Sequence, residues 1–156
     1  MKDHFNSLKA VTTQVAAVKS GSTTTVKGLA VDVSGFESAT AVVEVGNSAD
    51  TLSGSLKITP TLLASDTTVD GDFVAVPVAD MIGGSQGAAG EIAVIDAPAE
   101  DTLVFMAGYR GAKRYLRVDF VLTGNHATGT PAAASILLSN ARQHPGGACA
   151  AGAALT

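Results

Sequence analysis

Aromatic and charged residues are scarce in this sequence, and tryptophan is absent. Aromatic residues make up 4% of the 156 positions. Charged residues make up 15%, which is below the roughly 25% of an average soluble protein. The hydrophobic share is nevertheless 46%, and the chain holds 27 alanines and 16 threonines. We therefore expect a core of small and β-branched side chains and a largely uncharged surface, which suits a protein that packs against other subunits.

Other absences exclude whole classes of protein. The single cysteine, Cys149, excludes an intrachain disulfide and a multi-cysteine metal site. A net charge of −4 argues against a protein that binds nucleic acid by neutralising phosphates. The chain has no run of 18 apolar residues, and residues 1–10 contain no apolar segment. We therefore expect neither a membrane span nor an ordinary secretory signal.

Apolar and polar residues alternate along most of the chain, which is typical of β-strands. The clearest strand is 113–123, with Leu116, Val118, Phe120 and Leu122 on one face and Tyr115, Arg117, Asp119 and Thr123 on the other. Further strands are expected at 12–19, 24–33, 41–45, 55–59, 73–76, 91–95, 103–109 and 132–139, and a single helical turn at 78–82. Turns are expected at Ser20-Gly21, Ser34-Gly35, Gly46-Asn47, Asp70-Gly71, Gly83-Gly84 and Gly124-Asn125.

This spacing predicts an all-β protein, an antiparallel β-sandwich or jelly roll of about eight or nine short strands, with a barrel as the other possible closure. The single β-sandwich (jelly-roll) domain is expected to span residues 11–144. Residues 1–10 are expected to form an N-terminal arm, and the Gly/Ala-rich residues 145–156 a C-terminal arm. Because both ends have little apolar bulk, we expect at least one of them to lie on a neighbouring chain.

Two groups of carboxylates are candidate sites. Clustered oxygens at Asp66, Asp70 and Asp72 could hold calcium, but the spacing lacks the EF-hand order, so a solvated turn is favoured. Glycoside hydrolysis would need a carboxylate pair, drawn from Glu37, Glu44, Asp96, Glu100 and Asp101. A sugar platform usually needs tryptophan, which is absent, so a hydrolase is not favoured.

A nucleophile motif is a third candidate. Gly83, Ser85 and Gly87 match the letters of the nucleophile elbow, but that motif requires a strand followed by a helix in an α/β sheet. A flexible loop is the better interpretation here. The sequence therefore predicts no enzyme, no cofactor and no metal.

Positive charge is concentrated between residues 109 and 117. The candidate partner-binding residues are Tyr109, Arg110, Lys113, Tyr115 and Arg117. Interleaved bases and aromatics can bind single-stranded nucleic acid, but the chain is acidic overall, so docking onto a protein is favoured over nucleic acid or a merely solvated face. Lys113, Tyr115 and Arg117 are expected to point outward. Arg114 falls on the apolar face, where it is expected to extend to solvent or pair with a carboxylate.

Three segments carry a family resemblance: VDVSGFESA at 31–39, GYRGAKRYLRV at 108–118, and ILL at 136–138 in a strand that ends near His144-Pro145. In this order and at these separations they resemble a family of small tailed-bacteriophage virion proteins that are typically encoded beside the major capsid protein. The resemblance covers roughly residues 26–145, and the run from Gly108 to Arg117 is its specific part. Related jelly-roll or sandwich proteins serve as capsid decoration, or cement, proteins.

The resemblance implies a non-enzymatic structural protein on the surface of the virion capsid. Its partner would be the major capsid protein, and it would be a homotrimer or another homo-oligomer on the shell, with no nucleic-acid or membrane partner. Two alternatives stay open: a carbohydrate-binding jelly-roll module on the virion, and another structural component of the head or tail.

Overall fold

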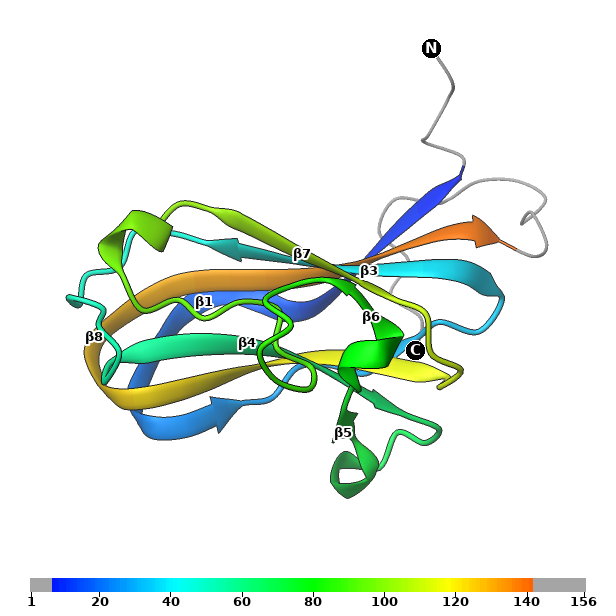
Figure 1. Cartoon of the computed structure of the whole chain (residues 1–156), viewed down its shortest axis with the longest axis horizontal. Coiled ribbons are helices and arrows are strands. Elements are labelled where there is room, and N and C mark those ends of the chain that lie inside the picture. Colours follow the sequence, from blue (N-terminus) through cyan, green and yellow to red (C-terminus); the bar gives the residue numbers. More distant parts are fainter. Residues whose placement is uncertain (1–6, 142–156) are drawn as a thin grey trace, which may run out of the picture.

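The computed structural model describes residues 7–141, which are β almost throughout (Figure 1). The strands are β1 (Leu8–Val26), β2 (Val31–Asp32), β3 (Phe36–Val45), β4 (Lys57–Ser65), β5 (Val74–Ala75), β6 (Met81–Gly83), β7 (Val104–Tyr109) and β8 (Tyr115–Ala141). Helix is limited, in the described residues, to three 3-10 turns at Asp70–Asp72, Val78–Asp80 and Pro98–Glu100. The strands pair antiparallel in one eight-stranded sheet, so the expected all-β antiparallel class is confirmed.

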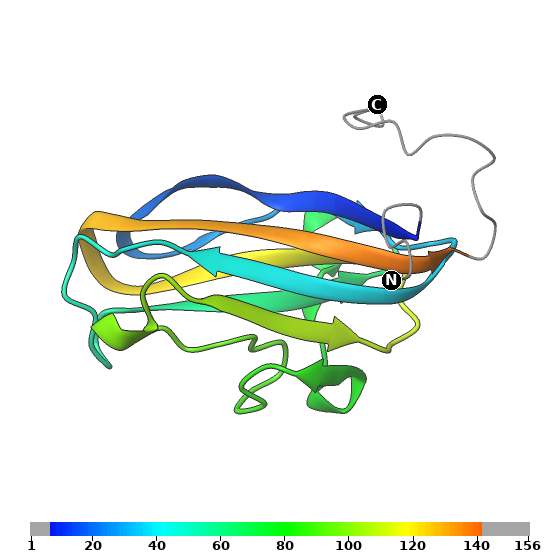
Figure 2. The same cartoon turned by 90° about the horizontal axis from the view of Figure 1, so that it is seen from above.

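The sheet curls because its longest strand, β8, belongs to both of its halves (Figure 2). Residues 115–123 of β8 pair with β4, and residues 132–141 pair with β3. β1 runs beside β8 through both regions. We call β5, β4, β2, residues 115–123 of β8 and residues 21–26 of β1 the first half-sheet. The second half-sheet consists of residues 8–19 of β1, residues 130–141 of β8, β3, β7 and β6.

The bend in β1 and β8 differs from the sequence prediction. Turns were expected at Ser20-Gly21 and Gly124-Asn125, but both strands continue through these positions. Gly21, Gly124 and Gly129 have φ angles of 120°, 85° and 89°, which glycine adopts readily. The pairing of β1 with β8 also shifts register at four points, and such bulges bend a strand without ending it. The glycines therefore bend the ladder, and the predicted strands at 113–123 and 132–139 are parts of one strand.

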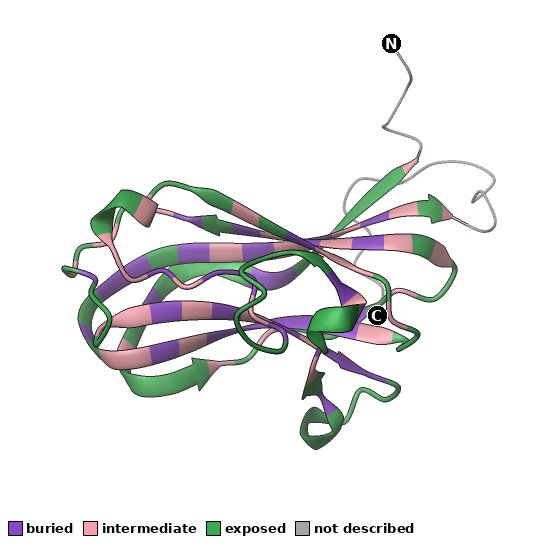
Figure 3. Cartoon of the chain, viewed as in Figure 1, coloured by how far each residue is buried: buried purple, intermediate pink, exposed green. Residues whose placement is uncertain are grey.

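The core lies between the two half-sheets. The predicted inward residues of 113–123 are all buried: Leu116, Val118, Phe120 and Leu122. The second half-sheet contributes Ala41, Val43, Ala134, Ile136 and Leu138 from β3 and β8, all at most 2% exposed. Alternating buried and more exposed bands are visible in Figure 3 along β4 and along residues 131–139 of β8. Alanine and valine fill much of this core, as the composition predicts.

Some predicted boundaries move. Residues 91–95, expected as a strand, form only isolated bridges to β4, with Ile58 and Ile95 exchanging backbone hydrogen bonds of 3.0 and 2.9 Å. β1 begins at Leu8, where Leu8 pairs with Ser139, so the strand reaches into the segment predicted as the N-terminal arm. The predicted arm at 145–156 lies outside the described residues. The helical turn expected at 78–82 is present as the 3-10 turn Val78–Asp80.

Candidate protein-interaction site

The structure brings the predicted partner-binding residues together at one end of the molecule. Tyr109 ends β7 in the second half-sheet and Tyr115 begins β8 in the first, so residues 110–114 cross between the halves. The Tyr109 ring folds back over Gly111, where a Cβ atom would lie 2.4 Å from the phenol oxygen. A larger residue at position 111 would have to displace the Tyr109 ring, so Gly111 allows this close approach.

Intramolecular ion pairs neutralise most of the positive charge in this region. Lys113 pairs with Asp66, and Arg114 pairs with Asp32 at 2.8 Å, as expected of a residue near a carboxylate. The hydrogen bond from Arg114 lowers the pKa of Asp32 to about 2. The pKa of Asp66 is likewise lowered by its hydrogen bond from Lys113. These cations are therefore less available to attract a negatively charged partner than the sequence suggests.

Arg110 behaves differently from its neighbours. Its Nε donates a 2.7 Å hydrogen bond to the carbonyl oxygen of Ala79, and its backbone N–H bonds to the carbonyl oxygen of Asp80. These contacts fasten the β7–β8 connection to the 3-10 turn Val78–Asp80. Tyr115 is half-buried, and the Arg114 guanidinium lies 5.0 Å from its ring centre.

The expectation that Arg117 points into solvent is wrong. The Arg117 side chain is on the face opposite the core, as the alternation predicts, but it is only 8% exposed. It pairs with Asp70, and its guanidinium lies 4.3 Å from the ring centre of Phe73. The loop between β4 and β5 carries both residues over this face of the first half-sheet. Tertiary packing, which strand alternation does not reveal, buries the side chain.

Asp119, also on that face, completes the buried pair. Its Oδ1 lies 2.9 Å from Nε of Arg117, at ion-pair distance but without hydrogen-bond alignment, and accepts a 2.9 Å bond from the Gly28 N–H. Burial raises the pKa of Asp119, with the Gly28 and Arg117 contacts acting in the opposite direction. Arg117 and Asp119 are therefore structural residues of the first half-sheet rather than docking residues.

The acidic loop considered as a calcium site has a structural role. It connects the antiparallel strands β4 and β5, as the predicted hairpin turn requires, and Asp70–Asp72 form a 3-10 turn within it. Asp70 pairs with Lys27 and Arg117, and Asp72 accepts a 2.6 Å hydrogen bond from Thr67 Oγ1. Within residues 7–141, no group of three or more His, Cys, Asp or Glu side chains is arranged to hold a metal ion.

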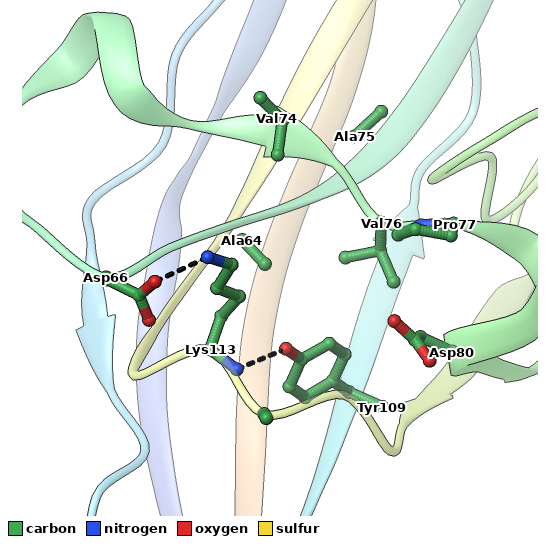
Figure 4. Close-up of a pocket in the computed structure, with 10 residues that line it drawn as sticks. Ala64, Asp66, Val74, Ala75, Val76, Pro77, Asp80, Tyr109 and Lys113 are labelled. Atoms are coloured by element: carbon green, nitrogen blue, oxygen red, sulfur yellow. Dashed lines mark hydrogen bonds and ion pairs between the residues drawn. The ribbon is translucent and has the colours of Figure 1, made fainter.

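A pocket of about 360 Å³ lies beside the β7–β8 connection (Figure 4). Its apolar wall is formed by Ala64, Val74, Ala75, Val76, Pro77 and Ala112. Its polar groups are Asp66, Asp80, Tyr109 and Lys113, with the Asp66–Lys113 pair on one side and Asp80 on the other. Tyr109 and Lys113 were predicted from sequence to bind a partner. No sequence pattern indicated that Asp66 and Asp80 would lie in the same site.

A second surface, the outer side of the second half-sheet, was not predicted from the sequence. Residues directly opposite on neighbouring strands point to the same face. Val42 pairs with Met106 and Ser135, and Thr40 pairs with Gly108 and Leu137, while the intervening Ala41 is buried. We call this surface the outer face; its members are Ala10, Thr12, Thr40, Val42, Ile82, Val104, Met106, Ser135 and Leu137.

The outer face is apolar and nearly free of charge. Ile82, Val104 and Met106 are 58%, 59% and 55% exposed. Glu44, paired with Val104 and Ala133, is the charged residue that the described β3 places on this side. Exposed apolar patches of this kind on a β-sheet commonly mark interaction surfaces. The alternation in 41–45 could have revealed the outward position of Val42. Which strands lie side by side to form the outer face could be seen only in the tertiary structure.

The other candidates from sequence do not assemble a catalytic group. The Ser85 hydroxyl donates a hydrogen bond to the Glu91 carboxylate. His126 is the histidine of the described region, and its Nε2 lies 3.2 and 3.0 Å from the carbonyl oxygens of Lys57 and Thr123. The Glu100 carboxylate accepts backbone N–H bonds from Asp96 and Ala97, and Asp101 accepts one from Ser48. The Ser85, Glu100 and Asp101 side chains thus hold loops, and His126 contacts backbone oxygens of β4 and β8.

No family model matches the chain, and no curated protein sequence matches it significantly. Among residues 7–141, no helix has the length and apolar character needed to cross a membrane.

Proposed function

We propose that this chain is a non-enzymatic structural protein of a tailed-phage virion that binds the outer surface of the assembled capsid and stabilises it. We further propose that its curled sheet is a β-sandwich of the jelly-roll type and that it acts as a homotrimer or another homo-oligomer. The family resemblance at 31–39, 108–118 and 136–138 motivates the virion assignment. Binding to the assembled shell but not to free subunits would stabilise the shell by mass action.

The observation that carries the proposal is the outer face. Five strands spaced about 4.8 Å apart make it about 20 Å wide, which is enough for a protein contact. Its exposed Ile82, Val104 and Met106 would be covered by an apolar surface of the shell. Many copies on a symmetric shell bind multivalently, so each contact can be modest.

A charge placed in the centre of the outer face tests this function. Met106→Glu should lower occupancy on shells at least about tenfold, because desolvating an unpaired carboxylate costs more than about 1.4 kcal/mol. Val69→Glu is the matched control, since Val69 is 61% exposed and lies in the β4–β5 loop away from the outer face. The measurement is cosedimentation with shells of the source virus that lack this protein, after circular dichroism has confirmed that both variants fold.

Three outcomes would contradict the proposal. Normal shell occupancy of Met106→Glu would show that the outer face does not contact the shell. A virion map that places the chain in the tail, or binding to host glycans without binding to shells, would replace capsid decoration by one of the alternative functions.

A further inference from the structure

The pocket beside the β7–β8 connection contains a carboxylate that the fold leaves without a partner. Asp66 is paired with Lys113, but no hydrogen bond or ion pair joins the Asp80 side chain to any described residue. The nearby Arg110 guanidinium donates to the carbonyl oxygen of Ala79 instead, and only the Arg110 backbone N–H bonds to the carbonyl oxygen of Asp80. Two carboxylates and one ammonium line the pocket, so it retains one negative charge.

Tyr109 adds a second polar group that is only partly used. Its hydroxyl oxygen accepts a 2.8 Å hydrogen bond from the Lys113 N–H, which leaves the hydroxyl proton free to be donated. Burial raises the pKa of Tyr109, and the negative charges of Asp80 and Asp66 act in the same direction. Asp80 is thus near enough to the phenol to influence it, and in Figure 4 its carboxylate points toward the space beside the Tyr109 ring.

The opposite wall is apolar and suits an aliphatic stem. Val74, Val76 and Pro77 line it, facing Tyr109 across the pocket (Figure 4). The volume of about 360 Å³ is at the small end of ligand pockets, which run from roughly 300 to 1,000 Å³. A long side chain with an apolar stem and a charged tip matches this combination of size, wall and charge.

We infer that this pocket binds the cationic side chain of a lysine or arginine from a partner polypeptide. The stem lies along the exposed Val74 and Pro77, and the charged group reaches the Asp80 carboxylate beside the electron-rich face of Tyr109. The inference rests on the proposed function in one respect, namely that the partner is a subunit of the capsid shell.

Blocked amino acids test the pocket without any shell. The full chain, labelled with ¹⁵N, is titrated with the N-acetyl, N-methylamide derivatives of lysine, arginine and norleucine, and amide shifts are followed by NMR. Lysine and arginine derivatives should cause saturable shifts at the amides of Asp80, Tyr109 and Lys113. Norleucine, which has a stem of similar length but no charge, should bind at least about fivefold more weakly.

Asp80→Asn should weaken binding of both cationic derivatives at least about fivefold. Asp96→Asn is the matched control, since it makes the same change at a carboxylate outside the pocket. Equal binding of norleucine, no shift at the pocket, or unchanged binding by Asp80→Asn would each overturn the inference.

Shell binding separates this inference from the proposed function. Asp80→Asn should also reduce shell occupancy while the outer face is intact. If Asp80→Asn loses the blocked amino acids but occupies shells normally, a shell subunit is not the source of the side chain. If the wild-type chain binds blocked lysine but does not bind shells, the proposed function is wrong and the inference that the pocket binds a cationic side chain is supported.

Discussion

At the residue scale, the buried pair of Arg117 and Asp119 defines how the first half-sheet is covered. Both side chains lie on the face away from the core, yet they are only 8% and 4% exposed. Phe73 and Asp70, carried by the loop between β4 and β5, close over them. A charged pair that is desolvated in this way tolerates loss of one partner poorly, because the other charge is then left buried and alone.

Arg117→Glu should therefore destabilise the isolated protein by about 3–5 kcal/mol, since it places a second negative charge beside Asp119. Urea unfolding followed by far-UV circular dichroism measures this loss. Lys113→Glu makes the same charge reversal at an exposed ion pair and should leave the unfolding midpoint much closer to that of the wild type. An Arg117→Glu protein as stable as Lys113→Glu would show that the burial of Arg117 contributes little.

At the element scale, the fold depends on a long strand that bends without breaking. At Gly124 a Cβ atom would lie 2.5 Å from the carbonyl oxygen of Ser55 and 2.9 Å from Cδ1 of Leu56. The backbone there has a φ of 85°. Gly124 is thus required for two separate reasons, its φ angle and the close approach of the chain before β4.

Comparing Gly124→Ala with Gly35→Ala separates these two reasons. Gly35 has a similar φ of 87°, but nothing lies within 4 Å of the point that a Cβ atom would occupy, so alanine there carries only the backbone cost. Gly124→Ala should be about 1–3 kcal/mol more destabilising than Gly35→Ala, because the extra methyl group forces the neighbours apart. Equal losses in urea unfolding would mean that the contact with Ser55 relaxes freely.

At the scale of the whole molecule, charge and apolar surface are segregated. The ion pairs among the described residues gather where the β4–β5 loop and the β7–β8 connection meet the first half-sheet. The outer face of the second half-sheet carries the exposed Ile82, Val104 and Met106 instead. The described residues therefore present two different kinds of surface, one apolar and one with a charged pocket.

The ion pairs make the stability of the whole molecule sensitive to acid. Contacts with cations lower the pKa values of Asp32, Asp66 and Asp70 from the ordinary value of 3.8, in the case of Asp32 to about 2. Their contribution is complete above the unfolded-state pKa and is lost as the pH falls through the lowered values. The free energy of unfolding should therefore decrease between about pH 4 and pH 2.

Arg114→Gln should flatten this decrease, because Asp32 then titrates closer to its ordinary pKa. Arg110→Gln is the control, since Arg110 forms a hydrogen bond with Ala79 but no ion pair among the described residues. Urea unfolding at several pH values from 5 down to about 2 compares the three proteins. Equal slopes for wild type and Arg114→Gln would mean that the Asp32 pair does not contribute.

Much of the fold could be predicted because strand alternation is a local property of the sequence. A side chain on a strand has only two directions, so Leu116, Val118 and Phe120 had to share a face, and that face became the core. The same reasoning could not predict the continuity of β1 and β8, because a glycine beside a polar residue is compatible with both a turn and a bend. Only pairing along both halves of β8 decides between them.

The sequence alone determined the strand character, the two faces of residues 113–123 and the core of small side chains. It also placed Tyr109 and Lys113 close together in one short segment. The tertiary structure decided that Arg117 is buried, that Asp80 meets Tyr109 in a pocket, and that Val42, Met106 and Leu137 share one exposed face. The physical reason is the sequence separation over which each feature is set. Alternation depends on adjacent residues, whereas burial on the second side of a sheet and the joining of strands depend on segments tens of residues away.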